Sequence, residues 1–355
     1  MAGSRRLRLA VALLGMVAAL AACGPLGAGS EPGGPAVLYV GWDADDRLQL
    51  YRTAPDGGEA RKLTSAPLGV RDYAVSPGGD AIVYSASRED GGSDLWRVAP
   101  DGRENALLLA CPEMSCDGAV WAPDGQRLVY TRRPVDAESE SGPRLYWLAW
   151  PGAATQPVFA GDEQMGLLPR FSANGDWLTF VRPGALPSVL AYPLDGGEPV
   201  ELPGDVVAPV VWHPFDLSFL SSVVLYEGES AYTHLFAVQV ETQAIEDVSG
   251  VAETEDTGAA WSPDGEWIAF TRKVARAPVG KQVWLMREDG SELHPLTSDP
   301  ESNFSNLSWS ADGELLLVQR FAMAGGGRPE VWLLEVESGA LSLVAQPGSA
   351  PSWLP

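Results

Sequence analysis

Short apolar runs alternate with turn signals along most of the chain, and the turn signals are pairs built from Asp, Asn, Gly and Pro. A clear example contains Trp261, the pair Asp264-Gly265 and a second apolar run. Glycine readily adopts the positive φ of a tight hairpin turn, so this spacing predicts two antiparallel strands joined by a short turn. Two more apolar runs follow and complete a predicted four-stranded sheet. The predicted strands lie at 257–263, 267–272, 282–287 and 293–297.

This segment is one copy of a repeat. Each copy contains an aromatic residue or Val, a small residue, Pro or Ala, and a turn pair such as Asp-Gly. Successive copies begin 41 to 50 residues apart, and a period of this length with several short strands per repeat is typical of a β-propeller. The copies begin at Val75, Trp121, Phe171, Trp261 and Trp309, with a degraded copy at Trp212 and a truncated copy at Trp353.

The two ends of the repeat region complement each other. Residues 37–64 contain only the later strands of a repeat, and the missing first strand is found at 350–353. We therefore expect the C-terminal strand to complete the first sheet. The sequence predicts an all-β, seven-bladed β-propeller of four-stranded antiparallel blades over 37–355.

The repeats resemble those of the TolB-like, WD-type β-propeller family, whose blades carry Trp-Ser-Pro-Asp-Gly before an apolar strand. Residues 261–270 fit this pattern nearly perfectly, and residues 121–130 fit it well. The resemblance implies a fold that occurs in periplasmic and surface proteins that bind other proteins, and in the gating domains of prolyl peptidases. The chain departs from both, because we expect no α/β domain before or after its repeats.

The N-terminal segment has the features of a targeting signal. Three Arg residues precede an uncharged run over 9–22, which is shorter than the roughly 20 residues that span a bilayer. Leu20-Ala21-Ala22-Cys23 then resembles the bacterial lipobox, which implies cleavage before Cys23 and lipidation of its thiol. We expect a signal peptide over 1–22, a Gly/Pro-rich linker over 23–36, and a lipid-anchored, extracytoplasmic protein of the cell membrane. An ordinary secretory signal is the alternative.

Composition narrows the classes of function. The chain has 24 Lys and Arg against 47 Asp and Glu, a net charge of −23, which argues against binding nucleic acid or an anionic membrane surface. Its contact with the membrane is therefore expected through the lipid alone. The 39 Gly and 29 Pro residues also argue against a mainly helical protein.

Few residues suggest covalent or metal chemistry. Cys111 and Cys116 lie in one polar loop of an exported protein, which favours a disulfide; a metal pair and two free thiols are the alternatives. Asp43, Asp45 and Asp46 are weak candidates for Ca²⁺, against the simpler interpretation of a solvated acidic loop. We expect no other cofactor.

No catalytic motif stands out. The three His residues lie in separate repeats, and the chain contains neither a G-x-S-x-G elbow nor an H-E-x-x-H helix motif. We therefore expect a monomer that binds a protein or peptide. An enzyme acting on a carbohydrate or lactone at the central channel is the alternative.

Loop lengths place the expected binding surface. One face of the predicted ring carries short Asp-Gly-type turns, which we expect to be too short to shape a pocket. The other face carries long loops, where binding residues usually lie. Arg71 and Arg170 are cations in an acidic chain, and we expect them to attract carboxylates of a partner. The candidate residues at the channel mouth on this long-loop face are Arg71, Asp72, Tyr73, Asp117, Arg170, Asp205, Glu255, Asp256 and Asn303.

Overall fold

Short β-strands account for the regular structure of the chain. The computed structural model describes residues 35–355 apart from 137, 138, 140, 153, 162, 163, 186, 207, 208, 251 and 252, and every helix-or-strand element in these residues is a strand. The all-β prediction is confirmed. Cys23, the predicted signal peptide and nearly all of the predicted linker lie outside the described residues. None of the described residues forms a helix long and apolar enough to span a membrane.

The strands are short, as the spacing of the turn signals predicts. Their bounds are β1 Ala36–Trp42, β2 Leu48–Thr53, β3 Arg61–Lys62, β4 Val70–Val75, β5 Ile82–Ser87, β6 Ser93–Val98, β7 Ala106–Leu109, β8 Met114–Trp121, β9 Arg127–Pro134, β10 Arg144–Ala149, β11 Thr155–Pro157, β12 Leu167–Phe171, β13 Trp177–Arg182, β14 Ser188–Pro193, β15 Val200–Pro203, β16 Val211–Trp212, β17 Ser218–Glu227, β18 Ser230–Gln239, β19 Ala244–Asp247, β20 Thr254–Trp261, β21 Trp267–Val274, β22 Gln282–Arg287, β23 His294–Pro295, β24 Ser302–Trp309, β25 Leu315–Ala322, β26 Glu330–Glu335, β27 Leu341–Ala345 and β28 Ser349–Leu354.

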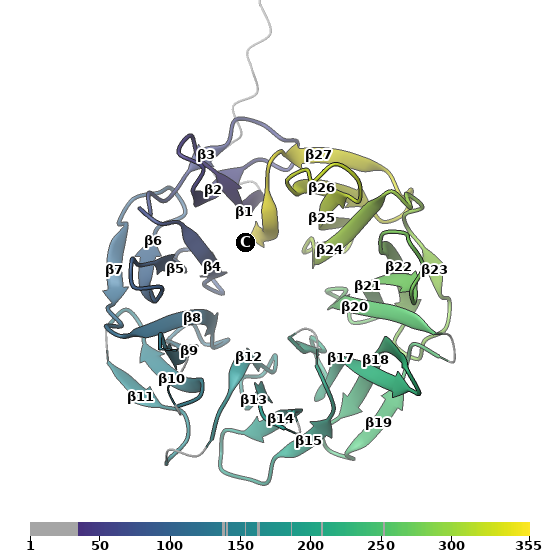
Figure 1. Ribbon diagram of the computed structural model, residues 1–355, viewed down its shortest axis with the longest axis horizontal. Helices are drawn as coiled ribbons and strands as arrows, with labels where there is room; N and C mark the ends of the chain where they lie inside the picture. The colour runs from purple at the N-terminus through teal and green to yellow at the C-terminus, as the bar shows by residue number, and fades with distance from the viewer. Residues whose placement is uncertain are drawn as a thin grey trace, which may run out of the picture. The chain divides into compact units, whose positions relative to one another are not determined.

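Antiparallel pairing joins the strands in groups of four, which we call units and name by their strands, for example the β4–β7 unit. Single parallel bridges, Ser93 to Ser115 and Thr233 to Glu255, link two pairs of neighbouring units, so two of the sheets contain eight strands. The units follow one another around a ring (Figure 1), and β4, β8, β12, β20 and β24, each the first strand of its unit, lie on the inner side. Apolar side chains fill the space between units; one such cluster contains Leu38, Tyr84 and Leu354.

The two ends of the described region pair as the sequence predicts. β28 pairs antiparallel with β1, with Val37 opposite Trp353, so the C-terminal strand is the inner strand of the sheet that contains β1–β3. The Tyr73 hydroxyl on the neighbouring β4 lies within hydrogen-bond distance of the Ala350 carbonyl (2.7 Å) and the Ser352 hydroxyl (3.0 Å). These bonds connect β28 to the next unit as well.

The repeated aromatic residue forms hydrogen bonds between units. The Nε1–H of Trp121 donates to the Ala74 carbonyl of the preceding unit at 3.2 Å, and Trp309 donates to Ala260 in the same way at 3.0 Å. Trp353 repeats the contact with Ser308 at 3.0 Å. Trp261 is the exception, because its Nε1 is buried and has no partner in the described part of the chain.

The Ser-Pro-Asp-Gly phrase forms a self-contained turn. The Ser262 hydroxyl donates to Asp264 and accepts the backbone N–H of Trp267 at 2.9 Å. The Ser262 hydroxyl bond, with a further one from the Glu266 backbone, lowers the pKa of Asp264. Gly265 has φ +76°, and a Cβ there would lie 2.6 Å from Nε2 of His213, so the position requires glycine.

The degraded copy at Trp212 lacks the Asp-Gly turn of the other repeats, and its second strand, β17, begins at Ser218. Two predicted strand boundaries are wrong. The first strand of the 257–297 segment begins earlier, at Thr254, where it continues toward the long-loop face. Its fourth strand is only His294–Pro295, because it pairs with β22 over just two residues.

Candidate functional site

Arg71 lies at the surface, but its guanidinium is held by hydrogen bonds within the protein. Its Nε donates to the Ser87 hydroxyl at 3.0 Å, Nη1 to the Ser115 hydroxyl at 3.1 Å, and Nη2 to the carbonyls of Gly91 (2.7 Å) and Gly92 (3.1 Å). Its Nη1 also lies 4.0 Å from a carboxylate oxygen of Asp117. The guanidinium therefore ties β4 to the neighbouring loop and to β8, and has few donors left for a partner.

Asp72 and Asp117 are bound into the same region. The Gly118 backbone N–H donates to Asp72 at 3.0 Å, and burial raises the pKa of this carboxyl. Asp117 accepts from Arg133 at 2.7 Å and from the Ser115 hydroxyl at 3.0 Å. Asp117 is therefore already neutralised by cations of its own unit and of β4, whereas Asp72 lies beside β8 without a close ion pair among the described residues.

Arg170 differs from Arg71, the other cation among the predicted channel-mouth residues. Its Nη1 donates to the Pro169 carbonyl at 2.7 Å, and it forms no ion pair with the residues described. The side chain is half-buried, and burial lowers the pKa of its guanidinium, while the charge of Asp72 opposes that shift. Since a guanidinium carries five N–H donors, most of those of Arg170 are available to a ligand.

The remaining predicted residues lie on other units. Asp256 is fully buried and accepts two bonds from Arg272, at 2.8 and 2.5 Å. Glu255 lies 3.3 Å from Nζ of Lys273, and Asn303 accepts the backbone N–H of Lys281 at 3.1 Å. Burial lowers the pKa of Lys281. These groups form a separate, internally paired network on β20–β22 and β24.

Asp205 also has an internal partner, because it accepts the hydroxyl of Tyr226 at 2.6 Å. The predicted channel-mouth residues thus divide into two groups: Arg71, Asp72, Tyr73, Asp117 and Arg170 on β4, β8 and β12, and Glu255, Asp256 and Asn303 on β20 and β24. A hollow of about 470 Å³ lies beside the β4 members of the first group, and we call it the channel hollow. It is lined by Arg71, Asp72 and Tyr73 together with residues of β24 and β28, among them Asn306 and Ser352.

Bulges interrupt the inner strands at matching places. The pairing register of β8, β12, β20 and β24 with the next strand shifts near one residue with positive φ in each strand, and β28 shows the same feature where it pairs with β1. A bulky residue in this conformation is strained, and such strain is concentrated at functional sites. From the sequence alone, a positive φ is expected only at the two bulge positions that are glycines. The bulge residues are Gly118, Leu168, Gly258, Asn306 and Ala350.

Several repeats share an Arg at the same position, and the sequence analysis did not identify it as a structural or functional residue. Arg272 ends the second predicted strand of its repeat, and aligned repeats place Arg132, Arg182 and Arg320 at the same point. Arg272 pairs with Asp256, Arg182 pairs with Glu201, and Arg320 lies 2.8 Å from Asp299. The repeat alignment contained this signal, and it marks internal ion pairs in three of these units, whereas the guanidinium of Arg132 lies over the Tyr146 ring at 5.4 Å without an ion pair among the described residues.

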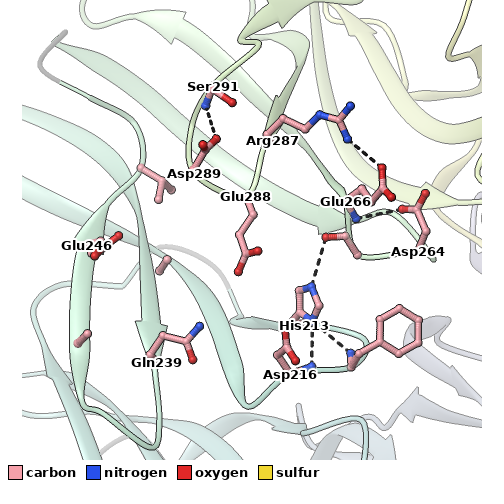
Figure 2. Close-up of a pocket in the computed structure, with 15 residues that line it drawn as sticks. His213, Asp216, Gln239, Glu246, Asp264, Glu266, Arg287, Glu288, Asp289 and Ser291 are labelled. Carbon is pink, nitrogen blue, oxygen red and sulfur yellow. Dashed lines mark hydrogen bonds and ion pairs between the residues drawn. The ribbon is translucent and has the colours of Figure 1, made fainter.

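The short turns do shape a hollow, so the expectation that they could not is wrong. A hollow of about 820 Å³ lies between the β16–β19 and β20–β23 units, on the face that carries the β16–β17, β18–β19, β20–β21 and β22–β23 turns (Figure 2). We call it the turn-face hollow. Each turn is short, but turns of two adjacent units form opposite walls. The length of a single turn therefore does not predict a pocket between units.

Carboxylates dominate the turn-face hollow. Glu246 and Glu288 have no hydrogen-bond or ion-pair partner in the described chain, and the Glu288 side chain extends toward His213 (Figure 2). Glu266 is paired with Arg287 at 2.9 Å. His213 accepts the backbone N–H of Asp216 at 2.9 Å on Nδ1, so Nε2 carries the proton and donates to the Gly265 carbonyl at 3.2 Å. This bond joins the two units under the hollow.

The candidate cation ligands do not converge. Asp43 accepts the backbone N–H groups of Arg47 and Asp45, the first of which contributes most to lowering its pKa, while Asp46 pairs with Arg328. No group of three acidic, His or Cys side chains suited to a metal occurs among the described residues. The structure thus gives no support to Ca²⁺ binding in this loop.

The side chains of the two described cysteines lie next to each other in space. The Sγ atoms of Cys111 and Cys116 lie 2.00 Å apart and their Cα atoms 6.2 Å apart. The disulfide stays a prediction for peptide mapping, and the positions of the two side chains are compatible with it.

Known proteins share this fold at low sequence identity. No protein-family model matches the chain. TolB from Acinetobacter baumannii superposes with a TM-score of 0.53 at 15% identity, covering 90% of this chain and 82% of TolB. An oligogalacturonate lyase in complex with manganese gives 0.61 at 14%, covering 88% and 85%. A puromycin-hydrolyzing peptidase of Mycobacterium tuberculosis gives 0.66 at 17%, covering 90% of this chain and 54% of the peptidase.

Among curated proteins, an uncharacterized peptidase of Bacillus subtilis (strain 168), YuxL, is 25% identical over 191 residues. The match covers 43% of this chain and 29% of the peptidase, so the chain spans less than a third of that relative's length. The structural similarities concern the fold alone. They show that the chain has a TolB-like β-propeller fold, one that also occurs in lyases and peptidases.

Proposed function

We propose that the chain is a membrane-anchored, extracytoplasmic lipoprotein whose seven-bladed β-propeller binds a protein or peptide at the channel mouth. The division of the strands into units of four supports the blade count, with β28 and β1–β3 forming one blade. The lipobox-like Leu20-Ala21-Ala22-Cys23 supports the anchor. The TolB-like fold supports a binding role, because the family resemblance implies proteins that bind other proteins.

The observation that carries the binding role is the state of Arg170. Arg71, Arg133, Arg272, Lys273 and Lys281 each lie within 4.0 Å of a carboxylate, whereas Arg170 is half-buried without one among the described residues. Burying a charge without an opposite charge is unfavourable, and a partner carboxylate removes that cost. A charge-assisted hydrogen bond there contributes about 1.5–3 kcal/mol to binding.

The test is partner capture by the full-length protein purified from membranes of its own host. Arg170→Gln removes the charge but keeps hydrogen-bonding capacity, and Arg103→Gln removes the same charge from an exposed turn. We expect Arg170→Gln to reduce recovery of the co-purifying partner about tenfold, which corresponds to 1.4 kcal/mol. Arg103→Gln should leave recovery unchanged. Equal recovery with both variants would contradict the role of Arg170.

The anchor has its own test. Cys23→Ser should leave unprocessed precursor or move the protein out of the membrane fraction. Membrane partition that does not change, with no lipid on the N-terminal peptide by mass spectrometry, would contradict anchoring without affecting the binding role.

A second function is favoured by one observation. Asp72 is a carboxyl of raised pKa that lines the channel hollow next to Arg71, and perturbed acids of this kind are concentrated at catalytic sites. The corresponding candidate is an enzyme that acts on a carbohydrate or lactone at the channel. Turnover of an oligosaccharide or lactone that Asp72→Asn abolishes, while partner capture persists, would favour this enzyme over the binding scaffold.

A further inference from the structure

A third hollow, of about 290 Å³, lies between the β1–β3 and β4–β7 units. It shares no lining residue with the channel hollow or the turn-face hollow. Its wall contains two aromatic rings, Tyr84 and Trp96, which are stacked with centroids 6.5 Å apart and an interplanar angle of 26°. Arg88, Asp94 and Asn105 add polar groups to the same lining. We call this hollow the Trp96 pocket.

The acidic group of the Trp96 pocket is fixed in orientation. Oδ1 of Asp94 accepts Nη1–H of Arg88 at 2.5 Å and the backbone N–H of Cys111 at 2.7 Å. Arg88 also donates to the Cys111 carbonyl at 2.7 Å. Within residues 35–355 as described, Oδ2 of Asp94 has no hydrogen-bond partner, so it is an oriented acceptor whose charge Arg88 balances.

Two donors accompany this acceptor. The Tyr84 hydroxyl donates to Oδ1 of Asn105 at 2.6 Å, and burial raises the pKa of Tyr84 to about 12, so the hydroxyl keeps its proton at neutral pH. This bond directs the amide and leaves Nδ2 of Asn105 without a partner in the described chain. Nε1–H of Trp96 is likewise unpaired among the described residues, and neither atom is enclosed by protein.

The partly buried Trp96 ring, backed by the buried Tyr84, lies beside unpaired donors and an acceptor, and this suits a ligand with an apolar face and hydroxyl groups. A saccharide ring has both, because its C–H face packs on an aromatic ring and each hydroxyl donates and accepts. Pockets for drug-sized ligands measure roughly 300–1,000 Å³, so this one holds a single ring. We propose that the Trp96 pocket binds one ring of a neutral saccharide, a function separate from partner binding at the channel mouth.

The loop that contains Cys111 and Cys116 holds polar side chains of the Trp96 pocket in place. Both backbone groups of Cys111 hold the pair formed by Arg88 and Asp94. We therefore expect reduction of the two cysteines to weaken saccharide binding while the fold persists.

The experiment is saturation-transfer NMR on the full-length protein with the methyl glycosides of glucose, galactose, mannose and N-acetylglucosamine. We expect saturable transfer to the ring protons of at least one glycoside, with a Kd of about 1 mM, typical of a weak contact. Asn105→Ala removes an exposed amide and should weaken binding about tenfold. Gln126→Ala, which removes an exposed amide from another unit, should leave it unchanged.

Three results would overturn the proposal. The first is the absence of saturable transfer to all four glycosides. The second is an equal loss of affinity in Asn105→Ala and Gln126→Ala. The third is tighter binding of tetramethylammonium than of every glycoside, because that result assigns the aromatic wall and Asp94 to a cation. Far-ultraviolet circular dichroism of each variant confirms that the fold is retained.

Discussion

Two equally buried tryptophans offer a direct test of the hydrogen bonds between units. Trp121 is 7% exposed and Trp261 is 8% exposed, and both occupy the same place in the repeat. Trp121 donates to the Ala74 carbonyl, whereas Nε1 of Trp261 has no partner among the described residues. Substitution by Phe removes the same atoms from each site, so the loss of packing is similar and only the hydrogen bonding differs.

The expected difference follows from this contrast. In Trp121→Phe the Ala74 carbonyl loses its bond, which costs about 1–3 kcal/mol when the group is buried. In Trp261→Phe an unsatisfied donor is removed, and a penalty of the same size disappears. We expect the free energy of unfolding to fall by at least about 2 kcal/mol more in Trp121→Phe than in Trp261→Phe.

Urea denaturation and scanning calorimetry measure this difference. The unfolding entropy is roughly 2.1 cal/mol/K per residue. For a folded region that spans residues 35–355, a difference of about 2 kcal/mol therefore corresponds to a difference of about 3 °C in Tm. Equal Tm shifts in the two variants would refute the reasoning. They would mean that the bond from Trp121 adds nothing beyond the packing of its ring.

Three other predictions concern the ring, the cysteines and pH. Deleting residues 350–355 removes β28 and exposes the edge of β1, so unfolding free energy should fall by several kcal/mol, and an unchanged Tm would contradict ring closure. Non-reducing peptide mapping should link Cys111 to Cys116; a loop this short stabilises by about 2 kcal/mol, so reduction should soften the region without unfolding it, and two free thiols would refute the pairing. Burial raises the pKa of Asp72, so its carboxyl becomes neutral at a higher pH than an exposed Asp does. As the pH falls through the pKa of Asp72, capture of an anionic partner should strengthen, and Asp72→Asn should abolish this pH dependence. Capture that weakens on acidification would contradict the prediction for Asp72.

The elements that the sequence predicts well depend on local chemistry. The turn at Asp264-Gly265 is recognisable because its hydrogen bonds come from Ser262 and Glu266, which lie within the same few residues. The match between residues 37–64 and the C-terminal strand is equally visible, because a repeat that lacks one strand needs that strand elsewhere. Periodicity therefore indicated the fold, including the pairing of β28 with β1.

The sites depend on contacts between units, which the pattern along the chain does not contain. Arg71 and Arg170 are equivalent as sequence candidates, yet Ser115 of the next unit helps to hold Arg71, whereas among the described residues the guanidinium of Arg170 has a hydrogen bond only to the carbonyl of its neighbour Pro169. The turn-face hollow and the Trp96 pocket also lie between units, where residues distant in sequence meet. Their linings follow from the lateral packing of sheets and not from any single repeat.

Site-specific photo-cross-linking tests the central claim, that a partner binds at the channel mouth, most directly. A photoreactive residue at Leu168, which is 37% exposed and precedes Arg170 on β12, samples the channel mouth, and the same residue at Glu288 samples the turn-face hollow. In intact membranes we predict a cross-linked partner at position 168 that Arg170→Gln diminishes, and none at 288. Cross-linking at 288 alone, unaffected by Arg170→Gln, would place the binding surface on the turn face and contradict the account.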